Sequence, residues 1–114
     1  MPDGYFITPE EVDQVEMRPG VFRRTLGTTD EAMLCEFFLR RGAVVEPHSH
    51  FNDQVGYVIS GQIEMTIGGE KRLCRSGESY AIPGGIVHSA VAMEDSLVID
   101  AFSPPRNDYR TEAR

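Results

Sequence analysis

The chain has 114 residues, of which 40% are hydrophobic, and its 11 Lys and Arg against 18 Asp and Glu give a net charge of −7 at pH 7. This length suits one domain with a single core, and the acidic balance argues against nucleic acid or an anionic membrane as a partner. Residues 1–20 carry acidic side chains and no long apolar run, and no 18-residue apolar stretch follows, so we expect a cytoplasmic protein.

One helix-start signal precedes the expected strands. Thr8-Pro9-Glu10-Glu11 has the spacing of a capping box, with proline at the first helical position. We therefore predict a short helical turn over Pro9–Gln14. After it, the chain reads as many short strands separated by turn signals, which is typical of a sandwich or a barrel.

Local patterns place these strands. Gln62–Ile67 alternates polar with apolar residues, and Gly68-Gly69 then allows a tight hairpin. We expect strands at Ala32–Leu39, Gln62–Ile67, Lys71–Arg75, Ser79–Ile82, His88–Met93 and Ser96–Phe102.

Two further observations concern the surface and the cysteines. Tyr57 and Ile59 are expected to point outward although they are apolar, which predicts that a second copy covers this face in a homodimer. Cys35 and Cys74 lack CxxC spacing and are interpreted as reduced core thiols without a function.

The histidines point to a metal site. All three, His48, His50 and His88, fall in two segments of the chain. His48 and His50 share one face of a strand, Gln54 has the same parity if the chain stays extended, and His88 must arrive from a distant strand. Imidazoles are common ligands of divalent metals, and an amide oxygen is a weaker donor. We predict a divalent metal ion on these four residues, with Ni, Zn, Mn and Fe all open.

The two segments, residues 42–61 and 77–92, resemble the paired motifs of the cupin superfamily, G-x5-H-x-H-x3-E-x6-G and G-x5-P-x-G-x2-H-x3-N. Gln54 stands where the family usually has glutamate, and Ala92 where it usually has asparagine. An amide ligand leaves a divalent ion its full charge, which favours Lewis-acid work on an anionic ligand over redox cycling. The resemblance implies an all-β, single-domain cupin jelly-roll barrel over residues 1–114, with the barrel core at about 20–103 and a C-terminal arm at 104–114.

The C-terminal segment brings a carboxylate, an aromatic ring and a guanidinium close together. Asp100 and Phe102 share one face of an apolar strand, and Pro104-Pro105 stiffens the exit toward Arg106. A desolvated carboxylate binds a proton more readily, which suits general acid–base work, and arginine can grip a carboxylate with two hydrogen bonds. The residues alone equally allow a turn-forming Asp100, a core Phe102 and a surface Arg106.

The glutamine and this C-terminal segment together resemble the KdgF-type pectin-degradation proteins, small homodimeric cupins that open the ring of 4,5-unsaturated monouronates from pectin or alginate to give linear keto acids. The resemblance implies that His48, His50, Gln54 and His88 bind the metal and that Asp100, Phe102 and Arg106 are the catalytic residues on the substrate side. The partner would then be a small anionic sugar acid.

Two other functions stay open from the sequence. The first is another metal-dependent cupin enzyme, a dioxygenase, lyase or isomerase, acting on a different small organic acid, because one fold hosts many reactions. The second is a cupin that binds a small molecule without turnover, against which Asp100 and Arg106 count.

Overall fold

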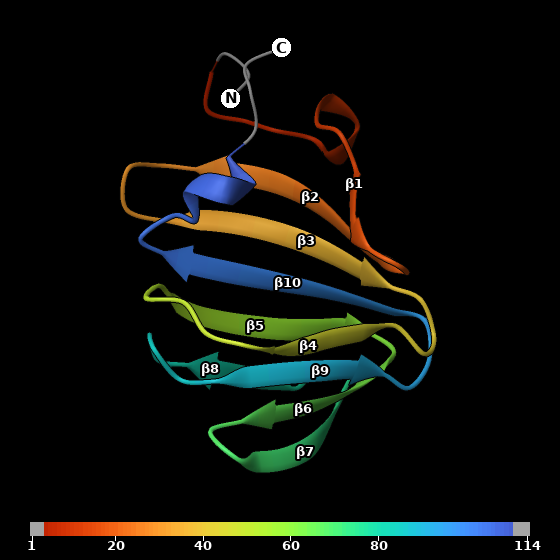
Figure 1. The fold of residues 1–114 in the computed structure, drawn as a ribbon. Helices are drawn as coiled ribbons and strands as arrows, with labels where there is room; N and C mark the ends of the chain where they lie inside the picture. The colour runs from red at the N-terminus through yellow and green to blue at the C-terminus, as the bar shows by residue number, and fades with distance from the viewer. Residues whose placement is uncertain (1–3, 111–114) are drawn as a thin grey trace.

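Strands make up nearly all the regular structure in the computed structural model, which describes residues 4–110 (Figure 1). They form two sheets. The larger sheet has the order β1-β2-β3-β10-β5-β8, with bounds Val15–Arg18, Val21–Thr28, Met33–Leu39, Ser96–Ser103, Asp53–Ser60 and Ser79–Ile82. The smaller sheet has the order β4-β9-β6-β7, with bounds Val44–His48, His88–Ala92, Gln62–Ile67 and Glu70–Arg75.

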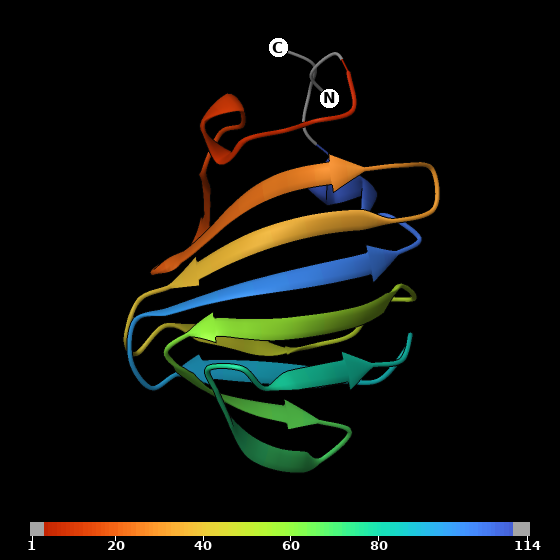
Figure 2. The same ribbon diagram turned by 180° about the vertical axis from the view of Figure 1, so that it is seen from behind.

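The chain winds between these sheets as a jelly roll. From β3 to β10, successive strands lie in opposite sheets except for the β6–β7 hairpin, and every strand pair is antiparallel (Figure 2). The expected all-β jelly roll is therefore confirmed. Within residues 4–110 the two sheets face each other without a hydrogen-bonded ladder that joins them into a closed barrel.

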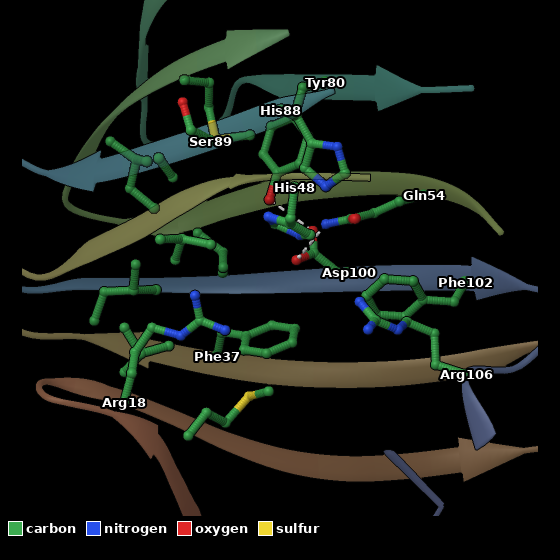
Figure 3. Close-up of a pocket in the computed structure, with 18 of the residues that line it drawn as sticks. Arg18, Phe37, His48, Gln54, Tyr80, His88, Ser89, Asp100, Phe102 and Arg106 are labelled. Carbon is green, nitrogen blue, oxygen red and sulfur yellow. Dashed lines mark hydrogen bonds between the residues drawn. The ribbon is translucent and has the colours of Figure 1, made fainter. Parts of the chain in front are cut away.

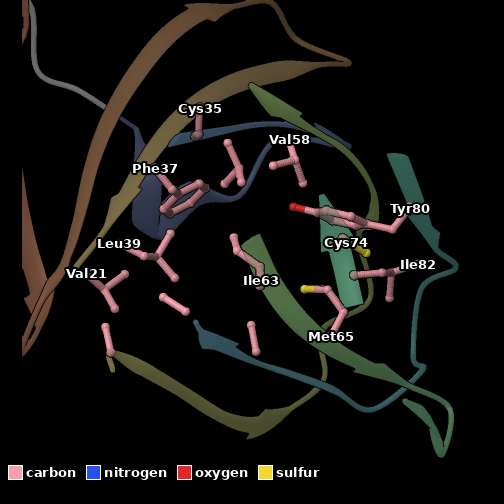
Figure 4. Packing of buried hydrophobic residues seen from close by; sticks show 14 of the residues in the cluster. Val21, Cys35, Phe37, Leu39, Val58, Ile63, Met65, Cys74, Tyr80 and Ile82 are labelled. Carbon is pink, nitrogen blue, oxygen red and sulfur yellow. The ribbon is translucent and has the colours of Figure 1, made fainter. Parts of the chain in front are cut away.

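The core fills the space between the sheets because inward and outward residues alternate along each strand. In β3, for example, Met33, Cys35, Phe37 and Leu39 are all buried. Figure 4 shows Phe37 and Leu39 packing toward residues of the facing sheet, such as Ile63. Cys35 and Cys74 are free and buried, as predicted.

The predicted helical turn is shorter than expected. It is a 3₁₀ helix, η1, limited to Pro9–Glu11, and the Glu11 carboxylate accepts a hydrogen bond from the Thr8 N–H at 3.1 Å. It ends early because Val12 takes an extended conformation and buries its side chain. A second 3₁₀ helix, η2, covers Asn107–Tyr109. No helix within the described residues has the length and apolar character needed to cross a membrane.

The outer face of the larger sheet is apolar along β5. Val55, Tyr57 and Ile59 are 51%, 47% and 43% exposed. The prediction that Tyr57 and Ile59 point outward is thus confirmed. Contiguous exposed apolar side chains of this kind are found at protein–protein interfaces.

Candidate metal and substrate site

The three histidines form one cluster where the two sheets meet. His48 ends β4 and is paired directly with His88, the first residue of β9. His50 lies in the loop that leads from β4 into β5. The ring centres are 4.3 to 5.7 Å apart, and one possible ligand atom from each ring lies within 4.8 Å of the others. The cluster is therefore able to hold a metal ion.

Backbone carbonyls orient all three rings. The Nδ1 atoms of His48, His50 and His88 lie 2.8, 3.0 and 2.9 Å from the carbonyl oxygens of Glu46, Asn52 and Ile86. A carbonyl only accepts, so each Nδ1 carries the proton in these bonds, and each Nε2 keeps its lone pair. Metal-binding histidines are oriented by the same kind of contact.

The Nε2 atoms of His50 and His88 face no hydrogen-bond donor, so their lone pairs are available to a cation. The Nε2 of His50 lies 3.1 Å from Oε1 of Gln54, so two acceptors face each other. Desolvation first, and the Arg106 charge second, lower the pKa of His50, which works against a second proton on its ring. The buried Nε2 of His88 has no hydrogen-bond partner. These observations fit a bound divalent ion.

Gln54 reaches the cluster by a route that differs from the prediction. The parity argument assumed an extended chain from His48 to Gln54, but the chain bends at residues 51–52 and crosses from the smaller sheet to the larger. That assumption is wrong. The amide nevertheless lies beside His50, because β5 begins at Asp53 and turns the buried Gln54 inward.

Asp100 is buried at the centre of the larger sheet, and each of its two carboxylate oxygens accepts a hydrogen bond. Oδ1 accepts a hydrogen bond from the Tyr80 hydroxyl at 2.6 Å, and Oδ2 accepts one from Nε2 of Gln54 at 3.2 Å (Figure 3). Desolvation raises the pKa of Asp100 to about 7, although both hydrogen bonds lower it. The predicted desolvation of this carboxylate is confirmed.

Phe102 and Arg106 lie next to the histidine cluster. The buried Phe102 ring meets His50 edge-on, with 5.9 Å between ring centres. The Asn52 amide donates to the carbonyl oxygens of Pro104 and Pro105, which anchors the segment leading to Arg106. This places the guanidinium carbon 5.8 Å from the Phe102 ring centre.

Two neighbours of Arg106 were not predicted. Asp108 accepts hydrogen bonds from Nε and Nη2 of Arg106 at 3.3 and 3.0 Å. Tyr109 stacks on the guanidinium, and the guanidinium carbon of Arg23 also lies over this ring, 4.5 Å from its centre. The hydroxyl of Thr25 donates to the Tyr109 carbonyl at 2.6 Å. These contacts dock η2 against the larger sheet, and no short sequence motif signals them.

One cavity connects most of the predicted residues. Six of the seven line it, together with apolar side chains from both sheets: His48, Gln54, His88, Asp100, Phe102 and Arg106. His50 is not among the lining residues, but its ring contacts those of His88 and Phe102. Tyr80 and Arg18 also line the cavity, and neither was predicted. Figure 3 shows Arg18 toward the end of the cavity opposite Arg106. Tyr80 could have been found from its inward parity with Ile82 inside the second histidine segment.

Comparison with known proteins places the chain in a family. Residues 36–100 match the cupin domain family. The chain is 36% identical to the pectin degradation protein KdgF of Dickeya dadantii, over 92% of this chain and 96% of that protein. The structure of KdgF from Halomonas sp. is 41% identical with a TM-score of 0.88, over 94% of this chain and 99% of that one. An RmlC-like cupin from Shewanella frigidimarina is 29% identical with a TM-score of 0.90, over 95% and 97%.

Proposed function

The chain belongs to the cupin family and, within it, to the KdgF pectin degradation proteins, and on this basis we propose that it opens the ring of 4,5-unsaturated monouronates. The observation that carries the proposal is that two histidines of the metal-competent cluster, His48 and His88, line one cavity with a buried carboxylate and an arginine. These groups suit a reaction in which a small cyclic acid loses one proton and gains another.

The proposed substrate is a cyclic hemiacetal whose ring oxygen and carboxylate sit on a carbon–carbon double bond. Ring opening moves the proton of the anomeric hydroxyl to the ring oxygen as the bond between the anomeric carbon and that oxygen breaks. The resulting enol becomes a ketone when the far carbon of the double bond takes a proton and the enol oxygen releases one. The reaction is an isomerisation, so no co-reactant is required.

We assign four residues to the metal. His48, His50 and His88 would bind it through Nε2, and Gln54 through Oε1. A divalent ion bound there would act as a Lewis acid on a ring or hydroxyl oxygen of the substrate, or would activate a bound water. Because all four ligands would be neutral, a divalent ion bound there would keep its full positive charge, which favours an anionic substrate.

The other assigned residues act on the substrate directly. Arg106 would hold the substrate carboxylate, with its side chain only 16% exposed and already fixed by Asp108 and Tyr109. Asp100 would move the proton, since its pKa near 7 lets the carboxyl group exist in both states near neutral pH. Phe102 would cover the sugar face and exclude water, which strengthens the surrounding electrostatic interactions.

The net charge of −7 does not conflict with an anionic substrate. Surface charges farther away than about 8–10 Å are largely screened at physiological salt, whereas a charge inside the cavity is not. Arg106 and Arg18 both line the cavity, against one acidic residue there, Asp100, so cationic side chains outnumber anionic ones in the lining.

The assembly and location belong to the same proposal. We infer a homodimer that buries the apolar row of β5, Val55, Tyr57 and Ile59, on the outer face of the larger sheet. We also infer one domain over residues 1–114, with its barrel core at about 20–103 and its arm at 104–114; residues 1–3 and 111–114 of this range lie outside the described part of the chain. A cytoplasmic location is supported by the two free thiols, which suit a reducing compartment.

The proposal is tested by loss of the ultraviolet absorbance of an unsaturated monouronate. The purified protein, with metal content measured, is added to 4,5-unsaturated galacturonate and to its alginate-derived counterpart, and NMR identifies the product. We expect faster formation of the linear keto acid than in buffer, and no acceleration with His50→Ala. A metal-loaded protein that leaves both spontaneous rates unchanged would refute the proposal and favour an oxygenase or a binding protein.

A further inference from the structure

Three residues from adjacent strands of the larger sheet lie in one row. Gly56 on β5 is paired with Asp100 on β10 and, on its other side, with Tyr80 on β8. All three positions face the interior, as the burial of Tyr80 and Asp100 shows. Side chains two strands apart are ordinarily separated by about 10 Å of sheet, with a third side chain between them.

Here the middle side chain is missing. A Cβ on Gly56 would lie 2.2 Å from Oδ1 of Asp100 and 2.2 Å from Cζ of Tyr80. Glycine therefore lets the Tyr80 ring lean across β5 and donate its hydroxyl to Asp100 at 2.6 Å. Figure 3 shows these two side chains converging beside Gln54.

The second oxygen of Asp100 determines how Gln54 is oriented. Nε2 of Gln54 donates to Oδ2 of Asp100 at 3.2 Å, and this leaves Oε1 facing Nε2 of His50 at 3.1 Å. A half-turn of the amide would place its oxygen against the Asp100 carboxylate and its nitrogen, which has no lone pair to give, toward the histidines. The contact with Asp100 disfavours that orientation.

We propose that Asp100, held by Tyr80 across Gly56, is a positioning residue that fixes the Gln54 amide with its oxygen toward the histidine cluster. The same contact explains why residue 54 is a glutamine and not a glutamate. A glutamate at position 54 would set two carboxylates facing each other where Nε2 and Oδ2 now lie 3.2 Å apart, out of solvent. Gln54 and Asp100 are thus a matched donor and acceptor, and each restricts the residue type at the other position.

This inference rests on the metal ligands of the proposed function but not on its substrate. Its test therefore measures metal affinity without any uronate, by competition between the protein and a chelator for Ni²⁺ or Zn²⁺. A failed uronate assay would leave this result intact, and a failed affinity test would leave the ring-opening activity intact. Thermal unfolding of each metal-free variant identifies any that does not fold.

The decisive comparison reverses the polarity of the pair. In Gln54→Glu with Asp100→Asn, the donor and the acceptor exchange positions and the hydrogen bond is kept. If the two substitutions acted independently, their fold-changes in metal affinity would multiply. We expect the double variant to bind the metal at least about tenfold more tightly than that product, because contacts that orient metal ligands typically have an effect of this size. Single effects that simply multiply, within about twofold, would overturn the proposal.

Three single variants give an independent test. Asp100→Leu removes the acceptor and should weaken metal binding about tenfold, whereas Asp100→Asn keeps an acceptor oxygen and should stay within about threefold of the parent. Tyr80→Phe keeps the ring but loses the hydroxyl, and should weaken binding severalfold. Equal metal affinity in Asp100→Leu, Tyr80→Phe and the parent would show that these residues only fill the core.

Discussion

The guanidinium carbon of Arg106 lies 4.2 Å from the centre of the Tyr109 ring. Arg23 stacks on Tyr109 as well, at 4.5 Å, and Phe102 meets it edge-on at 5.6 Å. The ring therefore joins the C-terminal 3₁₀ helix to the cavity wall. Arg106 is proposed to hold the substrate carboxylate. Tyr109, which is far from the histidines in sequence, therefore helps to determine where the positive charge of Arg106 lies.

Removing this ring should weaken substrate binding. Tyr109→Leu keeps an apolar side chain but loses the stacking, which is worth about 1 kcal/mol at a partly buried site, or roughly fivefold in affinity. We expect KM for the unsaturated uronate to rise by about that factor, with kcat and metal content nearly unchanged. Tyr109→Phe, which keeps the ring, is the matched control. Equal KM values in the leucine and phenylalanine variants would contradict a positioning role for the ring.

The histidine cluster makes a direct prediction about metal content. His50→Ala removes one of three imidazoles and the partner of Gln54, so elemental analysis after dialysis should find little metal compared with the parent. Phe51→Ala changes the next residue, which is 76% exposed, and should retain the metal. If His50→Ala kept the parental metal content, the assignment of this ligand would be wrong.

The apolar row on β5 makes a prediction about assembly. A lysine in place of Tyr57, at the middle of the row, would bury a charge without a partner in the proposed interface. Tyr57→Lys should therefore shift the protein from dimer to monomer in sedimentation equilibrium. Met93→Lys, at a residue that is 47% exposed in the turn between β9 and β10, should not. A monomeric parent protein would refute the dimer at once.

Local sequence patterns predicted the fold well where the structure depends on neighbouring residues. The alternation over Gln62–Ile67 and the two glycines after it give the β6–β7 hairpin with the expected first strand, because strand periodicity and turn chemistry are both local. The fold class and the histidine cluster were likewise predictable, since each of the two motifs is a short run with its own spacing, although the two motifs lie far apart in the chain.

Relationships across strands could not be predicted in the same way. The row of Tyr80, Gly56 and Asp100 depends on the register of three strands that are far apart in sequence, and no pattern within one strand fixes that register. The Asp108 contact with Arg106 is local, but it depends on the turn of η2. The sequence therefore predicted side chains that the fold brings together at the candidate site, but not the residues that hold them in place.

The final prediction separates binding from proton transfer within the proposed reaction. Arg106→Ala removes a charge-assisted grip on the substrate carboxylate, worth on the order of 1.5–3 kcal/mol, so KM should rise about tenfold or more. Asp100→Asn keeps the size of the side chain and one acceptor oxygen but cannot take up the proton, so kcat should fall while KM stays close to the parental value. Both variants should keep their metal, because neither residue is assigned as a ligand. Steady-state kinetics on the unsaturated uronate, with metal content measured for each variant, check both expectations. A rise in KM without loss of kcat in Asp100→Asn would remove Asp100 from the proton-transfer step and leave it only its contact with Gln54.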